Sequence, residues 1–305
     1  ILSKQLKKIE DKEYSYEHIE LDRTQDGIEA KRSNKLPISK FPVSRKLQDK
    51  TGCLVVWERP IPNPGFGMYY AGIDPVSEGK TTTSDSLCSI FVYKNQVEIT
   101  RETISGIEHI IEKDKIVAAW CGRYDDINKT HRQLELIIEW YNAWTVVENN
   151  ISLFIQHMIA KRKQKYLVPK SQILFLKELG SNKSVFSDYG WKNTGGLFKT
   201  HLISYAIEFL REEVDQDFDE NGNIINSTLG IERIPDPMLL KEMLAYRPGV
   251  NVDRLVAFSS LIAFAKVQQS NRGFAKRRES ELDNKFEDSK NLYKLKYTPF
   301  KNIGR

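Results

Sequence analysis

Asp74 is the first acidic residue whose position suits metal chemistry, because it ends an apolar run. The run is Tyr69 to Ile73, and Pro75 follows the acid directly. After a polar turn, Asp85 begins a second apolar run that ends at Tyr93. An Asp before Pro at a strand end is also a common turn former, since its carboxylate accepts backbone hydrogen bonds. A role in chemistry therefore requires partners from elsewhere in the chain.

Two further carboxylates occupy comparable positions. Glu148 follows the apolar run 143–147, and Asp253 lies at the start of an apolar helical pattern over 252–268. Each has an ordinary structural explanation, such as a first-turn acid favoured by the helix dipole. Three carboxylates that meet would repel one another unless cations lay between them. Mg²⁺ or Mn²⁺ suits such oxygen ligands, and two ions about 3.5–4 Å apart can promote phosphodiester hydrolysis.

The elements that must position these acids follow from apolar periodicity. Strands are predicted at 52–59, 68–74, 87–93, 97–104, 116–120, 143–148 and 173–179, with a small β excursion at 224–234. Strands 68–74, 87–93 and 97–104 read as a meander. Helices are predicted at 126–142, from Asn149 or Asn150 to 163, and at 199–213, 237–246 and 252–268. This order predicts a mixed α/β layer arrangement, in which the strands ending at Asp74 and Glu148 are neighbours.

Charge and composition divide the chain into three parts. Residues 1–51 are polar and predict a linker or arm, residues 52–269 form the globular domain, and residues 270–305 form a basic tail. The tail has ten Lys or Arg, among them Lys276, Arg277 and Arg278, against five Asp or Glu, which accounts for the whole net charge of +5. Such a tail is either a partner for phosphate or an acidic surface, or a solvated terminus.

Several classes of protein are disfavoured. No apolar run approaches the span of a bilayer, and no signal-peptide pattern opens the chain, so we expect neither a membrane partner nor secretion. Cys53, Cys88 and Cys121 lie far apart, which suits a reducing cytoplasm. Gly79-Lys80-Thr81 lacks the earlier glycine of a Walker A loop, so we expect no ATPase activity.

Together, the acidic segments resemble the nuclease domain of the large terminase subunits of tailed bacteriophages. The resemblance covers about 52–268 and rests on segments 70–75, 85–87, 146–150, 189–199, 234–243 and 252–257. It implies an RNase H-like fold, a mixed central sheet flanked by helices. It also implies an endonuclease that uses two Mg²⁺ or Mn²⁺ ions to cut concatemeric viral DNA during genome packaging.

Position by position, the resemblance assigns Asp74, Glu148 and Asp253 as metal-binding catalytic acids and Asp85 as a further acid near the metals. Many relatives have paired acids at the third position, whereas Asp253 is followed by Arg254. Arg254 either meets a phosphate or forms a structural ion pair. Lys199, which leads a later helix, is either a DNA contact or a solvated lysine.

The resemblance also implies partners and a place of action. These are double-stranded DNA, an N-terminal ATPase domain, a portal and a small terminase subunit, in the host cytoplasm during virion assembly. Because the first residue is Ile1, we expect a piece of a longer protein. Two alternatives remain: another RNase H-like nuclease of the resolvase or transposase type, or a non-catalytic module that binds DNA or a portal.

Overall fold

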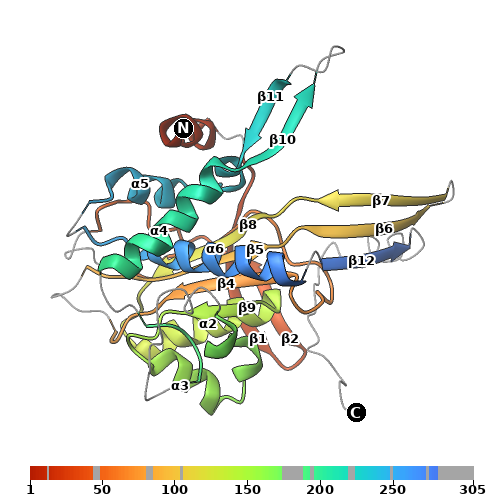
Figure 1. The fold of residues 1–305 in the computed structure, drawn as a ribbon. Helices are drawn as coiled ribbons and strands as arrows, with labels where there is room; N and C mark the ends of the chain where they lie inside the picture. The colour runs from red at the N-terminus through yellow and green to blue at the C-terminus, as the bar shows by residue number, and fades with distance from the viewer. Residues whose placement is uncertain are drawn as a thin grey trace.

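The computed structural model describes residues 1–11, 14–43, 49–79, 85–103, 106–173, 188–192, 196–218, 224–247, 250–272 and 275–280. Its centre is a seven-stranded mixed sheet (Figure 1), with the strand order β2-β1-β3-β8-β5-β4-β9. The strands are β1 (Glu17–Thr24), β2 (Gly27–Arg32), β3 (Leu54–Val56), β4 (Tyr69–Asp74), β5 (Cys88–Lys94), β8 (Lys115–Gly122) and β9 (Trp144–Val147). Neighbouring strands are antiparallel, except that β9 runs parallel to β4. The predicted mixed α/β arrangement is confirmed.

Helices cover both faces of this sheet. α2 (Ile127–Tyr141) and α3 (Leu153–Ala160) lie on one face, and α4 (Gly196–Arg211), α5 (Pro237–Ala245) and α6 (Asp253–Arg272) lie on the other (Figure 1). α1 (Leu2–Glu10) packs against α5. Short 3₁₀ turns occur at Gln164–Tyr166, Lys170–Gln172 and Gly230–Arg233. Within the described ranges, no helix is long and apolar enough to cross a membrane.

The sequence of β4 explains why the sheet is covered on both faces. Successive side chains of a strand point to opposite faces. Tyr69, Ala71 and Ile73 belong to the core on the α2 side, whereas Tyr70 belongs to the core on the α6 side. The ring of Tyr70 lies edge-on to Phe264 of α6, with centroids 5.1 Å apart. Even-numbered positions of β4 therefore face α6.

Two structures project from this body. β6 (Val97–Thr103) and β7 (Gly106–Glu112) form a hairpin that β12 (Ala275–Ser280) extends into a three-stranded sheet, and β10 (Glu213–Phe218) pairs with β11 (Ile224–Leu229). The prediction that 97–104 is the third strand of the central meander is wrong. β8 takes that place beside β5. Its residues Val117 to Trp120 are buried, whereas β6 alternates apolar and polar residues, so the apolar β8 suits the central position.

The N-terminal region also differs from the prediction. Residues 1–51 were expected to be a polar arm outside the core, yet β1 and β2 complete one edge of the central sheet. Ile19, Leu21 and Ile28 are buried in the core beneath α2. Their polar neighbours face solvent in an edge hairpin, which lowers the apolar content of the segment without removing its buried face. The predicted strand at 173–179 lies almost wholly outside the described residues.

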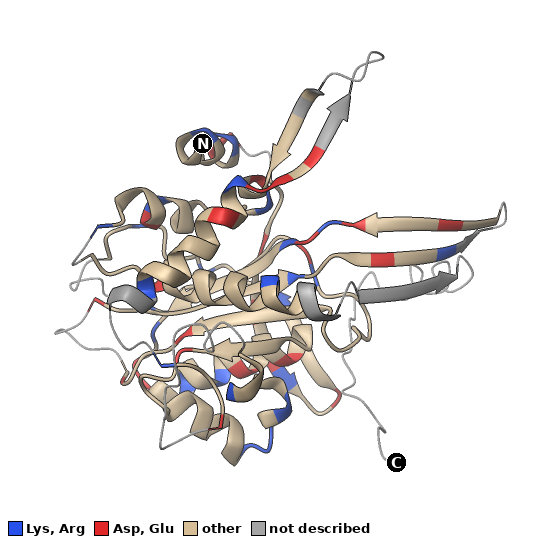
Figure 2. Ribbon diagram, viewed as in Figure 1, with Lys and Arg blue, Asp and Glu red and all other residues tan. Residues whose placement is uncertain are grey.

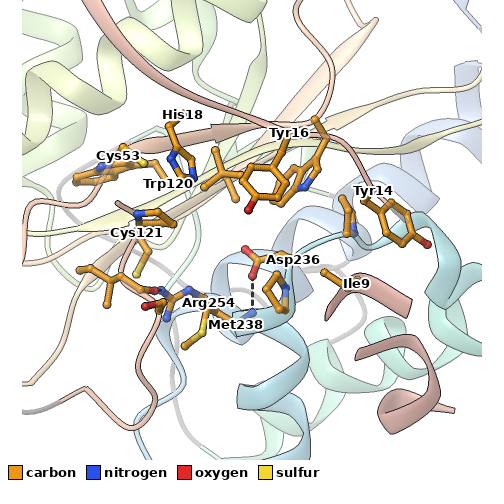
Figure 3. Close-up of a pocket in the computed structure, with 18 of the residues that line it drawn as sticks. Ile9, Tyr14, Tyr16, His18, Cys53, Trp120, Cys121, Asp236, Met238 and Arg254 are labelled. Atoms are coloured by element: carbon orange, nitrogen blue, oxygen red, sulfur yellow. Dashed lines mark hydrogen bonds between the residues drawn. The ribbon is translucent and has the colours of Figure 1, made fainter. Parts of the chain in front are cut away.

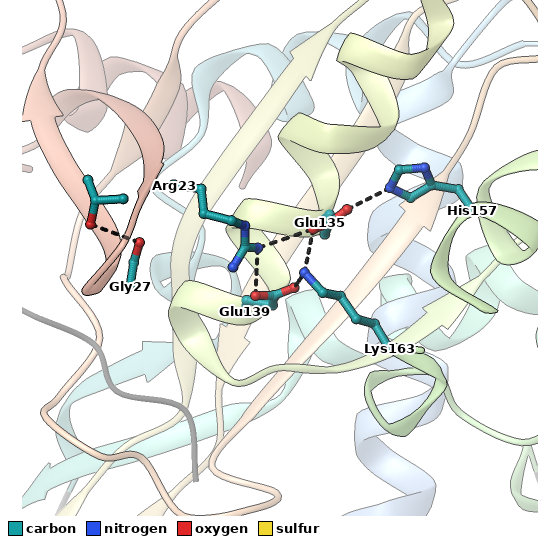
Figure 4. A network of polar contacts seen from close by, with 7 residues as sticks. Arg23, Gly27, Glu135, Glu139, His157 and Lys163 are labelled. Carbon is teal, nitrogen blue, oxygen red and sulfur yellow. Dashed lines mark hydrogen bonds and ion pairs between the residues drawn. The ribbon is translucent and has the colours of Figure 1, made fainter. Parts of the chain in front are cut away.

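A cluster of charged side chains links α2 to β1, to α3 and to the loop after α3 (Figure 4). The buried carboxylates of Glu135 and Glu139 accept hydrogen bonds from Arg23 of β1, at 3.1 and 2.7 Å, and both pair with Lys163. Nε2 of His157 in α3 lies 2.6 Å from Glu135. Burial alone would raise the pKa of Glu135, but the hydrogen bonds with His157 and Lys163 lower it to about 2. The cluster therefore joins β1, α2 and α3.

His131, one turn before Glu135, makes the stability of this region depend on pH. Burial, reinforced by the nearby His157, lowers the pKa of His131 to about 4. The unfolded chain takes up this proton near pH 6.5 and the folded chain only near pH 4, so acidification between these values favours unfolding. We expect the wild type to lose up to about 3 kcal/mol of unfolding free energy relative to His131→Phe over this interval. Urea denaturation of both proteins at pH 7 and pH 4.5 measures the difference, and parallel pH profiles would contradict it.

Candidate active site

The parallel pair β4 and β9 brings two of the predicted acids together. Ile73 pairs with Val147, and the backbone N–H of Glu148 donates to the carbonyl of Ile73 at 3.0 Å. Strand alternation places Asp74 on the α6 face, and it places Glu148 on the same face as the buried Trp144. The charge of Glu148 is close enough to Asp74 to contribute to the rise in its pKa. The prediction that these acids lie side by side is confirmed.

Helix α6 brings the third acid because it packs closely on β4. A Cβ on Gly72 would lie 2.4 Å from the carbonyl oxygen of Ala257 and 2.6 Å from Cβ of Leu261, so glycine is required for this approach. From this contact, Asp74 lies two residues along the strand, about 6.6 Å. Asp253 lies four residues back along the helix, about 6 Å. Both acids thus lie within about 7 Å of this contact along their own elements, and the charge of Asp253 acts on Asp74.

The three acids share one electrostatic environment. Burial, followed by the charges of Glu148 and Asp253, raises the pKa of Asp74 well above its usual value. Burial also raises the pKa of Asp253 to about 6, and the charge of Asp85 contributes to this rise. Asp85 and Asp253 line a common cavity of about 190 Å³. The charges of these carboxyl groups therefore act on one another, most clearly at Asp74 and Asp253.

Neutral donors orient the acids. The backbone N–H of Leu87 donates to Oδ2 of Asp253 at 2.7 Å, and Nδ2 of Asn251 donates to the same oxygen at 2.9 Å. Nδ2 of Asn150 donates to Oε1 of Glu148 at 2.6 Å. Neither asparagine was predicted from the sequence to have this role. Their spacing, two residues from an acid in each case, is the signal that could have found them, since Asn side chains often bond within such turns.

Lys199 and Arg254 have different roles in the structure. The ammonium group of Lys199, at the start of α4, is close enough to Asp74 to oppose the rise in its pKa, although burial and the neighbouring acids outweigh it. Arg254 is 3% exposed, and it donates to Oε1 of Glu242 and to the carbonyl of Ile38, both at 3.0 Å. The assignment of Arg254 to DNA contact is therefore wrong. It forms the structural ion pair that was the alternative.

The donor set fits a hard divalent cation. Asp74, Glu148, Asp253 and Asp85 offer only carboxylate oxygens, the ligands that Mg²⁺ and Mn²⁺ prefer. Within the described ranges, no three His, Cys, Asp or Glu side chains already form a metal-binding group. A cation bound among these acids would offset the repulsion between their charges.

The remaining predicted DNA contacts lie in β12. Lys276, Arg277 and Arg278 fall within Ala275–Ser280, which pairs in parallel with β6. The predicted tail therefore includes a strand of the projecting sheet. Residues 281–305 lie outside the described part of the chain.

A second cavity, of about 400 Å³, lies on the other side of Arg254 (Figure 3). Its wall is largely apolar and comes from α1, β1, β3, β8 and α5, including Ile9, Tyr16 and Met238. Asp236 also lines it, but its Oδ1 accepts the backbone N–H of Met238 at 2.7 Å as the cap of α5. The cavity therefore lacks the group of interacting acids that distinguishes the Asp74 site.

Comparisons with known proteins add no assignment: no family model, curated protein or solved structure matches this chain. The geometry of the site thus carries the functional argument.

Proposed function

We propose that this chain is a divalent-metal-dependent DNA endonuclease with an RNase H-like fold, of the kind found in the large terminase subunits of tailed bacteriophages. The main support is the proximity of three acids: Asp74 and Glu148 lie at the ends of parallel strands, and Asp253 lies at the start of α6. The antiparallel order of β4, β5 and β8, followed by α2 and β9, supports the fold. In this proposal the chain cuts concatemeric viral DNA during packaging.

The proposed reaction assigns separate roles to the residues of the site. Asp74, Glu148 and Asp253 would hold the divalent ions, since the charges of the other two acids both act on Asp74. When bound, Mg²⁺ or Mn²⁺ would activate water and stabilise the leaving oxygen of a phosphodiester. Asn150 and Asn251 hold the acids in orientation. Lys199 supplies positive charge beside Asp74, where it can attract a phosphate.

Two alternatives are separated by different observations. A resolvase or transposase would use the same acids. The segment from Tyr189 to Glu242 resembles the terminase nuclease domain, and it favours the terminase assignment over these two classes. A non-catalytic module would keep the sheet but would gain nothing from metal. Partners implied by the resemblance are double-stranded DNA, an ATPase domain, a portal and a small subunit, and the implied place of action is the host cytoplasm.

Metal binding provides the direct test. We expect Mn²⁺ to raise the melting temperature at pH 7, because it binds acids that repel one another in the folded chain and are dispersed in the unfolded one. At a concentration 100 times the dissociation constant, the gain is about 2.7 kcal/mol, or roughly 5–10 °C. Differential scanning fluorimetry with Mn²⁺ and with EDTA measures it. An unchanged melting temperature, together with intact plasmid DNA, would favour the non-catalytic module.

A further inference from the structure

The loop after α3 presents positive charge that the site does not use. Lys161, Arg162 and Lys165 are exposed, and among the described residues none of the three forms an ion pair. Lys163, in the same loop, is instead neutralised by Glu135 and Glu139. Figure 2 shows Lys and Arg gathered around α3 and the loop that follows it. The loop therefore has one cation in a structural ion pair, Lys163, and three exposed cations outside such pairs in the described part of the chain.

Two of these three cations, Arg162 and Lys165, border a shallow, open groove. Arg162, Gln164 and Lys165 line a hollow of about 350 Å³, together with Trp144 and Tyr189. The floor is aromatic and apolar, and the rim is basic. Lys165 lies over the ring of Tyr166, with Nζ 4.8 Å from the centroid. Basic rims with aromatic walls suit a nucleic-acid strand, because the cations contact phosphates and the rings contact sugars or bases.

The groove lies toward the opposite end of β9 from the proposed active site. Trp144 begins β9, and Glu148 follows its end, about 13 Å along the strand. Tyr189 lies in the segment that continues the sheet beyond β9, where Trp191 pairs with Glu148 in parallel. With about 3.4 Å for each base pair, 13 Å is about four base pairs. A duplex that runs along β9 from Glu148 would thus reach this groove within half a helical turn.

Arg162 has a left-handed backbone conformation, which is uncommon for a residue other than glycine. It has φ of +57°, immediately after the end of α3, where Lys163 N–H donates to the carbonyl of Met158 and Arg162 N–H to that of Ile159. Such helix ends favour glycine, since other residues strain the left-handed conformation. A large basic residue here adds an exposed charge at some cost to the fold.

We propose that the groove formed by Arg162, Gln164, Lys165, Trp144 and Tyr189 binds the phosphate backbone of DNA flanking the cleavage site. The choice of DNA as ligand rests on the proposed function. Arg162 and Lys165 hold successive phosphates, and the aromatic floor supports the adjoining sugars. The interaction is independent of sequence, because phosphates carry no base identity.

The test measures binding without cleavage. A labelled DNA duplex is titrated with protein in EDTA at about 50–200 mM salt, using fluorescence anisotropy. For Arg162→Gly/Lys165→Gln we expect affinity to fall at least about 10-fold, and the slope of log K against log salt to fall by about 1.8. The matched control is Lys31→Gln/Arg32→Gln, which removes the same charge from β2 at the opposite edge of the sheet, about 29 Å away. The control should keep the wild-type slope.

Stability separates binding from folding. Arg162→Gly should leave the melting temperature unchanged or raise it by up to about 3 °C, because glycine suits the left-handed position. If the melting temperature of Arg162→Gly falls instead, the variant Lys161→Gln/Lys165→Gln is used in its place. It must show the same decrease in the slope of log K against log salt. An unchanged slope in the groove variants, or an equal loss in the β2 control, would overturn the proposal. Since metal is absent, failure of the nuclease assignment would appear separately, as uncut plasmid DNA with normal salt-dependent binding.

Discussion

Asp74→Asn is expected to abolish Mn²⁺-dependent cleavage of plasmid DNA while making the metal-free protein more stable. The asparagine removes the central ligand, and losing several kcal/mol of charge stabilisation lowers the rate by at least about 10²–10³-fold. The amide is uncharged and has nearly the shape of the carboxyl group. Burial and the neighbouring acids oppose ionisation of Asp74, so a neutral side chain at this position should cost the folded protein less free energy at pH 7.

Opposite changes in activity and stability make this variant informative. A relief of about 1 kcal/mol would raise the melting temperature in EDTA by about 2–4 °C. Asp22→Asn is the matched control, since the side chain of Asp22 is exposed on β1, with three strands between β1 and β4 in the sheet order, and it should change neither property. Plasmid nicking assays and scanning fluorimetry measure both. Full cleavage by Asp74→Asn would reject the site, whereas lost cleavage with a large loss of stability would indicate a structural role.

The positions of the acids could be predicted because local sequence determines them. An apolar run long enough for one strand ends at Asp74, another ends before Glu148, and the parallel pairing of β4 with β9 aligns their ends. Asp253 begins α6, as its apolar pattern indicates. Which strand pairs with β5 was harder to predict from the sequence. β6 and β8 both follow turns, and only the burial of β8 on both faces distinguishes the strand that joins the central sheet.

Other features depend on contacts between distant segments, so periodicity alone could not reveal them. Ile19 and Leu21 are buried because β3 and α2 cover them, although charged residues surround them in sequence. Arg254 sits beside a metal-binding acid but turns to Glu242, twelve residues earlier. The groove at Arg162 forms only when the segment at Tyr189 lies beside β9. In each case a partner remote in sequence decides the role.

Gly72→Ala tests whether the packing of α6 on β4 holds the site together. The added Cβ would lie 2.4 Å from the carbonyl oxygen of Ala257 and 2.6 Å from Cβ of Leu261, and the backbone oxygen cannot turn aside. The helix must shift away from the strand, with an expected cost of about 1–3 kcal/mol. Asp253 is the first residue of that helix, so the shift should move it away from Asp74. Mn²⁺ should therefore also stabilise the variant less than the wild type.

Gly65→Ala is the matched control, because no atom lies within 4 Å of its added Cβ. We expect it to be neutral or to stabilise the protein by up to about 1 kcal/mol, through lower entropy of the unfolded chain. Urea denaturation with and without Mn²⁺ compares the two variants. If Gly72→Ala loses stability but keeps the full Mn²⁺ effect, the position of Asp253 does not depend on this contact. Loss of both, with Gly65→Ala unaffected, would link the close approach at Gly72 to the geometry of the acids.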